Sequence, residues 1–196
     1  MKKLILPMFA LLLAAPLSST QAQTAAAREY DIKRVTVELI ETPQYQVSGP
    51  PAKQHKPAKW LEIEVEFDAK PEFSDELVFN YYVYLNKRLF VGQVAHVNVE
   101  KSAGTPLHSV IYMSPKMIAR AVGAGKTLTA GEVTATVQIT KPGIQTAVAE
   151  KSSRPSQPNW WASLKQETGF LTNKNETPFG PLYWDRYEAI KPAAPR

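Results

Sequence analysis

Residues 60–67 have the sequence WLEIEVEF, in which Glu62, Glu64 and Glu66 alternate with apolar residues. Successive side chains of a β-strand point to opposite faces, whereas a helix would spread three glutamates around its circumference. The pattern therefore predicts a half-buried strand at the centre of a β core. We expect its carboxylates to lie on a solvated outer face. A glutamate cluster that binds a cation is the less favoured interpretation, because such spacing is ordinary on antiparallel sheets.

Alternating or aromatic-rich stretches predict further strands on both sides of this one. They are expected over residues 28–40, 77–85, 89–100, 107–113, 132–140 and 144–150. Short strands at this spacing, separated by turn residues, indicate two packed sheets. The predicted fold is mainly β, an immunoglobulin-like antiparallel β-sandwich of about seven strands over residues 23–150.

A single short helix is predicted between two of these strands, over residues 115–122. Ser114 suits the N-cap position, and Pro115 suits the first helical position, where its missing amide hydrogen costs nothing. Gly123 is expected to end the helix after about two turns. The helix is therefore predicted to connect two strands.

Residues 102–104, Ser-Ala-Gly, are expected to form a tight hairpin between the strands that end at residue 100 and begin at residue 107. That pairing would place His96 and His108 diagonally on the solvent-facing side of one sheet. Two imidazoles without a third ligand make a poor metal site. We therefore expect solvent-facing histidines and neither a metal nor any other cofactor.

The first 22 residues have the organisation of an export signal. Lys2 and Lys3 precede the apolar residues 4–17, and residues 20–22 provide a small-x-small cleavage site. The apolar run is shorter than the roughly 20 residues of a membrane span. We therefore expect an exported protein, periplasmic or extracellular, whose mature chain has no integral membrane segment. The chain contains no cysteine, so neither a disulfide nor a lipid anchor on cysteine is expected.

The charge gives no indication of nucleic-acid binding. The signal carries Lys2 and Lys3 but no acidic residue, so the formal net charge falls from +5 to +3 on its removal. The remaining basic residues are dispersed and do not form a stripe. Catalytic patterns are also missing, including a cysteine nucleophile and the G-x-S-x-G and H-E-x-x-H motifs. We therefore predict no catalytic residues and a protein that is not an enzyme.

The C-terminal region is unusually aromatic. A linker rich in serine, proline and glutamine is predicted over residues 151–159, followed by an extension over residues 160–196. Disordered tails are normally poor in aromatic residues, so this extension is expected to dock on its own sandwich or on a partner. Its candidate partner-binding residues are Trp160, Trp161, Phe179, Tyr183, Trp184 and Tyr187. Replacing Trp184 is expected to weaken the docking.

Residues 177–188, TPFGPLYWDRYE, lie behind a cysteine-free β domain with an export signal. This combination resembles a small family of bacterial periplasmic proteins encoded beside type IV pilus-like assembly genes. The resemblance implies an immunoglobulin-like fold and a structural or adaptor role in a fimbria-like surface appendage or a secretion apparatus. Protein partners of a pilus-like or envelope assembly follow from it, with self-association left open. It supplies no catalytic residues.

Two functional hypotheses remain open at this point. The first is an association module, because a sandwich with strand edges and an aromatic arm offers surfaces for other proteins. The second is a carbohydrate- or glycan-binding module, in which exposed tryptophan and tyrosine rings stack on sugars. Sugar binding requires aromatic side chains on an accessible face, whereas an adaptor hides them in protein contacts.

Overall fold

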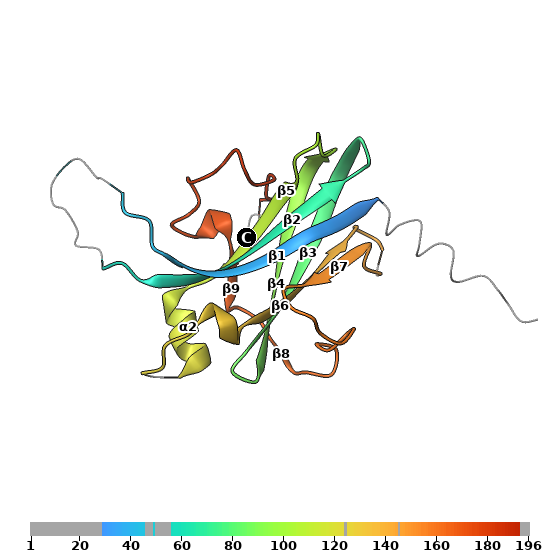
Figure 1. Cartoon of the computed structure of the whole chain (residues 1–196). Helices are drawn as coiled ribbons and strands as arrows, with labels where there is room; N and C mark the ends of the chain where they lie inside the picture. The colour runs from blue at the N-terminus through green and yellow to red at the C-terminus, as the bar shows by residue number, and fades with distance from the viewer. Residues whose placement is uncertain (1–28, 46–48, 50–55, 124, 145, 193–196) are drawn as a thin grey trace, which may run out of the picture.

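Two β-sheets pack face to face in the computed structural model, which describes residues 29–45, 49, 56–123, 125–144 and 146–192 (Figure 1). The first sheet has the strand order β1-β2-β5-β9 and the second has the order β7-β6-β3-β4-β8. The strands are β1 (Tyr30–Glu41), β2 (Lys59–Ala69), β3 (Phe73–Leu85), β4 (Arg88–Glu100), β5 (Leu107–Met113), β6 (Thr134–Thr140), β7 (Ala149–Ser152), β8 (Gln166–Glu167) and β9 (Leu171–Asn173). The predicted signal peptide, residues 1–22, lies outside the described residues.

The central strand is the one that the alternating sequence predicts. Leu61, Ile63, Val65 and Phe67 of β2 are all 0% exposed, because they point into the space between the two sheets. On either side β2 pairs antiparallel with β1 and β5. The predicted β-sandwich is confirmed, with β1 to β7 as its seven strands before the C-terminal extension.

The short helix is also confirmed. Helix α2 (Pro115–Val122) begins after Ser114, whose Oγ accepts a hydrogen bond from the Met117 amide at 3.3 Å. The helix ends at Gly123, which has a φ of 96°, a conformation that favours glycine. Ile118 and Val122 are buried, so one face of α2 covers part of the core.

The predicted hairpin between β4 and β5 is wrong. The two strands belong to different sheets, and residues 101–106 cross from one sheet to the other. Ser102 anchors this crossing to the end of β2: its amide donates to the Ala69 carbonyl at 2.9 Å, and its Oγ accepts from the Ala69 amide at 3.0 Å. Alternation of residue types shows which face of a strand is buried, but it does not show which strand lies alongside.

The C-terminal extension contributes to both sheets. β8 pairs parallel with β4, and β9 pairs antiparallel with β5. Gly92 of β4 allows this close packing, because a Cβ atom there would lie 2.7 Å from Ile111 Cδ1 and 2.8 Å from Leu171 Cβ. β7 continues to Ser152, so the first two residues of the predicted linker, residues 151–159, are strand. Among the described residues, no helix is long and apolar enough to span a membrane.

Candidate functional site

Aromatic side chains attach the extension to the sandwich by pairwise stacking. The ring of Trp161 stacks on Tyr82 with centroids 5.0 Å apart, and Phe170 lies against Phe90 at 4.5 Å. Phe179 stacks nearly parallel on Tyr112 at 4.7 Å and 8°. Such pairs add to the free energy gained from burying the rings. The orange-to-red extension follows the β8, β9 and β5 side of the molecule (Figure 1).

The six candidate partner-binding residues fall into two groups. Trp161 and Phe179 are each only 5% exposed, and Trp160 donates from Nε1 to Thr136 Oγ1 of β6 at 2.9 Å. Tyr187 is half-buried against β5. These four therefore contact the protein's own sandwich.

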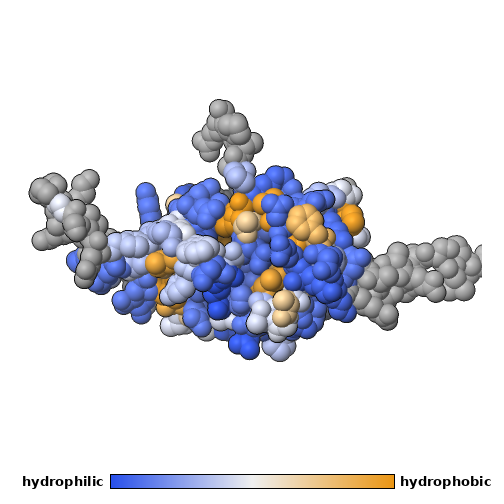
Figure 2. Space-filling view, turned by 90° about the horizontal axis from the view of Figure 1, so that it is seen from above, coloured by the Kyte–Doolittle hydropathy of each residue, from blue (hydrophilic) through white to orange (hydrophobic). Residues whose placement is uncertain are grey.

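The other two candidates face solvent. Tyr183 is 65% exposed and Trp184 is 79% exposed. The expectation that Trp184 helps to dock the extension is wrong, because almost all of its side chain lies outside the contact. We call Tyr183 and Trp184 the aromatic tip. Figure 2 shows a face of the molecule that is mainly hydrophilic, with apolar side chains gathered in a few separate patches.

A groove of about 530 Å³ lies between the outer face of the first sheet and the extension. We call it the extension groove. Its lining combines carboxylates with aromatic and aliphatic side chains: Ile40, Glu41, Pro43, Glu62, Glu64, Tyr112, Phe179, Leu182, Tyr183, Arg186 and Tyr187. This volume lies in the range of ligand sites in proteins. The aromatic tip thus borders the groove through Tyr183.

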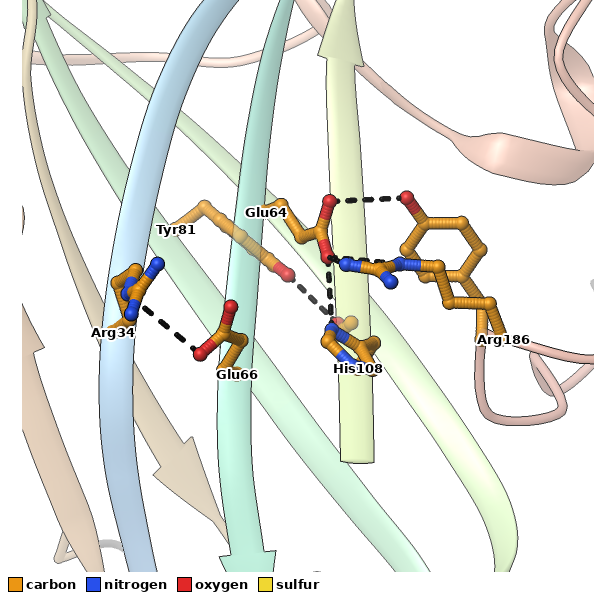
Figure 3. A network of polar contacts seen from close by, with 8 residues as sticks. Arg34, Glu64, Glu66, Tyr81, His108 and Arg186 are labelled. Carbon is orange, nitrogen blue, oxygen red and sulfur yellow. Dashed lines mark hydrogen bonds and ion pairs between the residues drawn. The ribbon is translucent and has the colours of Figure 1, made fainter. Parts of the chain in front are cut away.

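Glu64 ties the extension to the wall of this groove (Figure 3). Arg186 Nη2 donates to Glu64 Oε1 at 2.5 Å, and Tyr187 Oη donates to Oε2 at 3.2 Å. His108 Nδ1 lies 2.8 Å from Oε1, an ion-pair distance without the alignment of a good hydrogen bond. Burial is the main cause that raises the pKa of the Tyr187 hydroxyl, and the Glu64 charge adds to it. Three side chains therefore contact the Glu64 carboxylate. The expectation that this carboxylate is simply solvated is wrong.

Replacing Glu64 with alanine should lower the free energy of unfolding by about 2 kcal/mol, because Arg186, Tyr187 and His108 would all lose a partner. Glu66→Ala is the matched control on the same strand and face, since its Arg34 partner is 3.7 Å away and exposed. That change should cost no more than about 0.5 kcal/mol. Urea denaturation of both variants measures the difference. Equal losses would show that Glu64 does not hold the extension.

A buried polar chain lies below the groove and links both sheets to the extension. His96 is 1% exposed and Ser109 is 0% exposed, with His96 Nε2 2.7 Å from Ser109 Oγ. Ser109 Oγ also lies 2.7 Å from the Tyr81 hydroxyl. On its other side, His96 Nδ1 donates to the Glu188 carbonyl at 3.0 Å. The prediction of solvent-facing histidines is therefore wrong for both residues, since His108 is also largely buried.

Burial determines the protonation state of this histidine. Desolvation lowers the pKa of His96 to about 4, because a charged imidazole is unfavourable in the core. The contact between Ser109 and His96 has the distance of a nucleophile and its base. However, both side chains are closed off from solvent, so a substrate has no access to them. Within the described ranges, no three His, Asp or Glu side chains are grouped as metal ligands would be.

Comparisons with known proteins place the chain in a family. A family model matches residues 21–194, which is most of the sequence. The chain belongs to this family. The family is defined by its likeness to a pilus-associated extracellular protein of Akkermansia.

The fold of this family member is shared by a solved structure. A crystal structure of a protein from Akkermansia muciniphila matches with a TM-score of 0.67 and 22% sequence identity, covering 85% of this chain and 94% of that chain. At so low an identity the likeness shows the fold alone. A comparison with curated proteins finds no match.

Several important residues of this family member had no signal in the sequence. Arg186 and Glu64 are 122 residues apart, so nothing local connects them. Lys174 is 4% exposed, and its Nζ donates to the Gly180 carbonyl at 2.8 Å, which closes the turn that carries Phe179. Burial lowers the pKa of this lysine. Only the aromatic density of the extension indicated that this region is ordered.

Proposed function

We propose that the protein is a non-enzymatic, exported structural or adaptor component of a pilus-like apparatus. In this proposal it works through contacts with other proteins of a type IV pilus-like, secretion or surface-appendage assembly. Membership of a family defined by a pilus-associated extracellular protein supports the proposal. The gene neighbourhood that the sequence resemblance implies stays a prediction.

The aromatic tip is the observation that carries the proposal. Tyr183 and Trp184 are both exposed to solvent. Tyrosine and tryptophan are among the residues that contribute most binding free energy to protein interfaces. Tyr183 also has a φ of 51°, in the left-handed region that non-glycine residues rarely occupy. Such a conformation costs on the order of 1 kcal/mol and is typical of functional segments. A strained loop that displays two aromatic rings to solvent therefore supports an association site.

The tip is also held in place, which favours binding. The Arg186 amide donates to the Tyr183 carbonyl at 3.1 Å, and the Arg186 side chain is fixed to Glu64. On the other side, Phe179 is packed between Tyr112 and Trp60, stacked on the first ring and nearly perpendicular to the second. A rigid loop loses little conformational entropy when a partner binds. The buried aromatic residues of the extension thus support the two that are exposed.

Site-specific cross-linking tests the proposal. A photoreactive phenylalanine analogue placed at position 184 should cross-link the full chain, in its native envelope, to one protein of a pilus-like assembly, identified by mass spectrometry. The same analogue at Phe73 of β3, which is 52% exposed, is the matched control and should not capture that protein. The same product from both positions, or none from position 184, would contradict an adaptor role for the tip.

Glycan binding is the second candidate, because Trp184 offers a bare ring beside a groove that contains carboxylates. A glycan array separates the two functions. If the protein is an adaptor, no glycan on the array should bind the native chain in a way that depends on Trp184. A glycan that binds the native chain, but not that variant, would replace the proposal.

A further inference from the structure

The outer face of the first sheet has an unbalanced arrangement of charge. The register places Arg34 opposite Glu66, and the two form an ion pair at 3.7 Å. Two positions further along the same face of these strands, beyond Thr36 and Glu64, Glu38 lies opposite Glu62. Like charges directly opposite each other on neighbouring strands are destabilising. The sheet thus keeps an unfavourable pair beside the extension groove, which Glu62 lines.

The arginine that lines the groove is already bound to another carboxylate. Arg186, which also lines the groove, is bound to Glu64. None of the ion pairs between the described residues includes Glu38, Glu41 or Glu62. Burial is the main cause that raises the pKa of Glu62; the Tyr112 hydroxyl lowers it in part, and the charges of Glu64 and Glu38 raise it further. A second cation placed beside Glu62 would offset the cost of burying the Glu62 charge and its repulsion from Glu38 and Glu64.

The rest of the groove suits the stem of a long basic side chain. Leu182, Phe179 and Ile40 provide apolar surface next to Glu62 and Glu41. Lysine and arginine bury their methylene groups on such surfaces while the charged end reaches a carboxylate. The exposed Tyr183 ring at the edge adds a face on which a cation can lie. Apolar walls that lead to a carboxylate outside the ion pairs of the described residues are therefore complementary to a cationic side chain.

We infer that the extension groove binds a lysine or arginine side chain of the protein partner, with Glu62 as its principal acceptor and Glu41 beside it. This inference rests on the proposed adaptor function and specifies the chemistry of the partner's surface. Glu64 is not the acceptor, because Arg186 already occupies it. The partner would present a basic residue next to apolar ones, so that these contact the aromatic tip while the basic side chain enters the groove.

Nuclear magnetic resonance titration of the full chain tests the inference. The probes are N-acetyl-lysinamide and N-acetyl-argininamide, with N-acetyl-norleucinamide as a neutral probe of similar length. The two cationic probes should shift the amide signals of β2 and of residues 179–187, with dissociation constants in the millimolar range. Glu62→Gln should weaken their binding about tenfold, as expected for the loss of one charge-assisted contact. The neutral probe should cause no comparable shift.

The control variant is Glu72→Gln, which removes an acidic side chain that is 88% exposed and outside the groove. It should leave the binding of the cationic probes unchanged. Glu62→Gln should also be at least as stable as the native chain in urea, because it removes the repulsion from Glu38. Weakened binding without lowered stability would show that Glu62 acts in binding and not in folding.

Four outcomes would overturn the inference: no shift from either cationic probe, an equal response to the neutral probe, unchanged binding in Glu62→Gln, or tighter binding of putrescine than of the lysine probe. The last would indicate a free diamine as the ligand. Each can occur while the cross-link from position 184 still identifies a pilus-like partner. The failure of this inference is therefore distinguishable from the failure of the adaptor function.

Discussion

A chain that ends at Pro158 should lose at least about 5 kcal/mol of unfolding free energy, or should fail to fold, because three buried aromatic contacts disappear together. Phe90, which is 0% exposed, would lose the ring of Phe170, and Tyr112 would lose Phe179. The edges of β4 and β5 would lose the strands β8 and β9. Urea denaturation and light scattering of the two chains measure the loss of stability and the aggregation that uncovered apolar surface should cause.

The position of the truncation matters for this experiment. β7 ends at Ser152, and the Ser153 amide still donates to the Ala135 carbonyl at 2.7 Å, so a cut at residue 151 would damage the second sheet itself. Trp184→Ala is the control within the extension, because the side chain is 79% exposed. It should change stability by less than about 0.5 kcal/mol. A truncated chain that stays monomeric and equally stable would show that the extension docks on a partner and not on its own sandwich.

The elements that could be predicted are those whose signal is local. β2 alternates because one face is buried, and Ser114, Pro115 and Gly123 mark the helix ends through their own backbone preferences. The start of β3 was missed by four residues. The alternating, aromatic-rich pattern begins at residue 77, but pairing with β4 extends the strand back to Phe73.

The candidate site could not be predicted because it depends on strand partners. His96 lies on β4 and Ser109 on β5, and a hairpin between these strands would have left both histidines in solvent. Crossing between the sheets instead brings His96 inside, within 2.7 Å of Ser109. Similarly, the three glutamates of β2 look equivalent in sequence. Glu64 binds Arg186, Glu66 faces Arg34, and Glu62 faces another carboxylate, because the residue opposite each on β1 differs and the extension reaches Glu64.

The pH dependence of stability should report the burial of His96. Its pKa is about 4 in the folded chain against 6.5 for the ordinary side chain, so the unfolded chain binds the proton more tightly. The contribution of His96 to stability is therefore complete above pH 6.5 and is lost as the pH falls from 6.5 to about 4. The loss should amount to about 3 kcal/mol at the lower end, at about 1.4 kcal/mol for each pH unit. Urea denaturation at a series of pH values measures it.

Other groups around this histidine titrate in the opposite direction. Burial raises the pKa of Glu188, whose carbonyl accepts from His96 Nδ1, and burial also raises that of Glu62 in the groove. These carboxyl groups bind a proton more tightly in the folded chain, so acidification stabilises the fold through them. The Tyr81 and Ser109 hydroxyls contact the histidine network but do not ionise in this range; burial raises the pKa of Tyr81 further still. The total curve is therefore shallower than the contribution of His96 alone.

Comparison with a His96→Gln variant isolates this contribution, because both carboxyl groups remain. Glutamine can still donate within the network but takes up no proton, so the variant should be less stable than the native chain at pH 7. Between pH 6.5 and 4 the unfolding free energy of the variant should fall less steeply than that of the native chain. The difference between the two slopes should correspond to the uptake of about one proton on unfolding. The two curves should therefore converge as the pH falls, since only the native chain has a buried histidine to charge. Parallel curves would mean that His96 keeps an ordinary pKa, and that the junction between the sandwich and the extension at Glu188 is open to water.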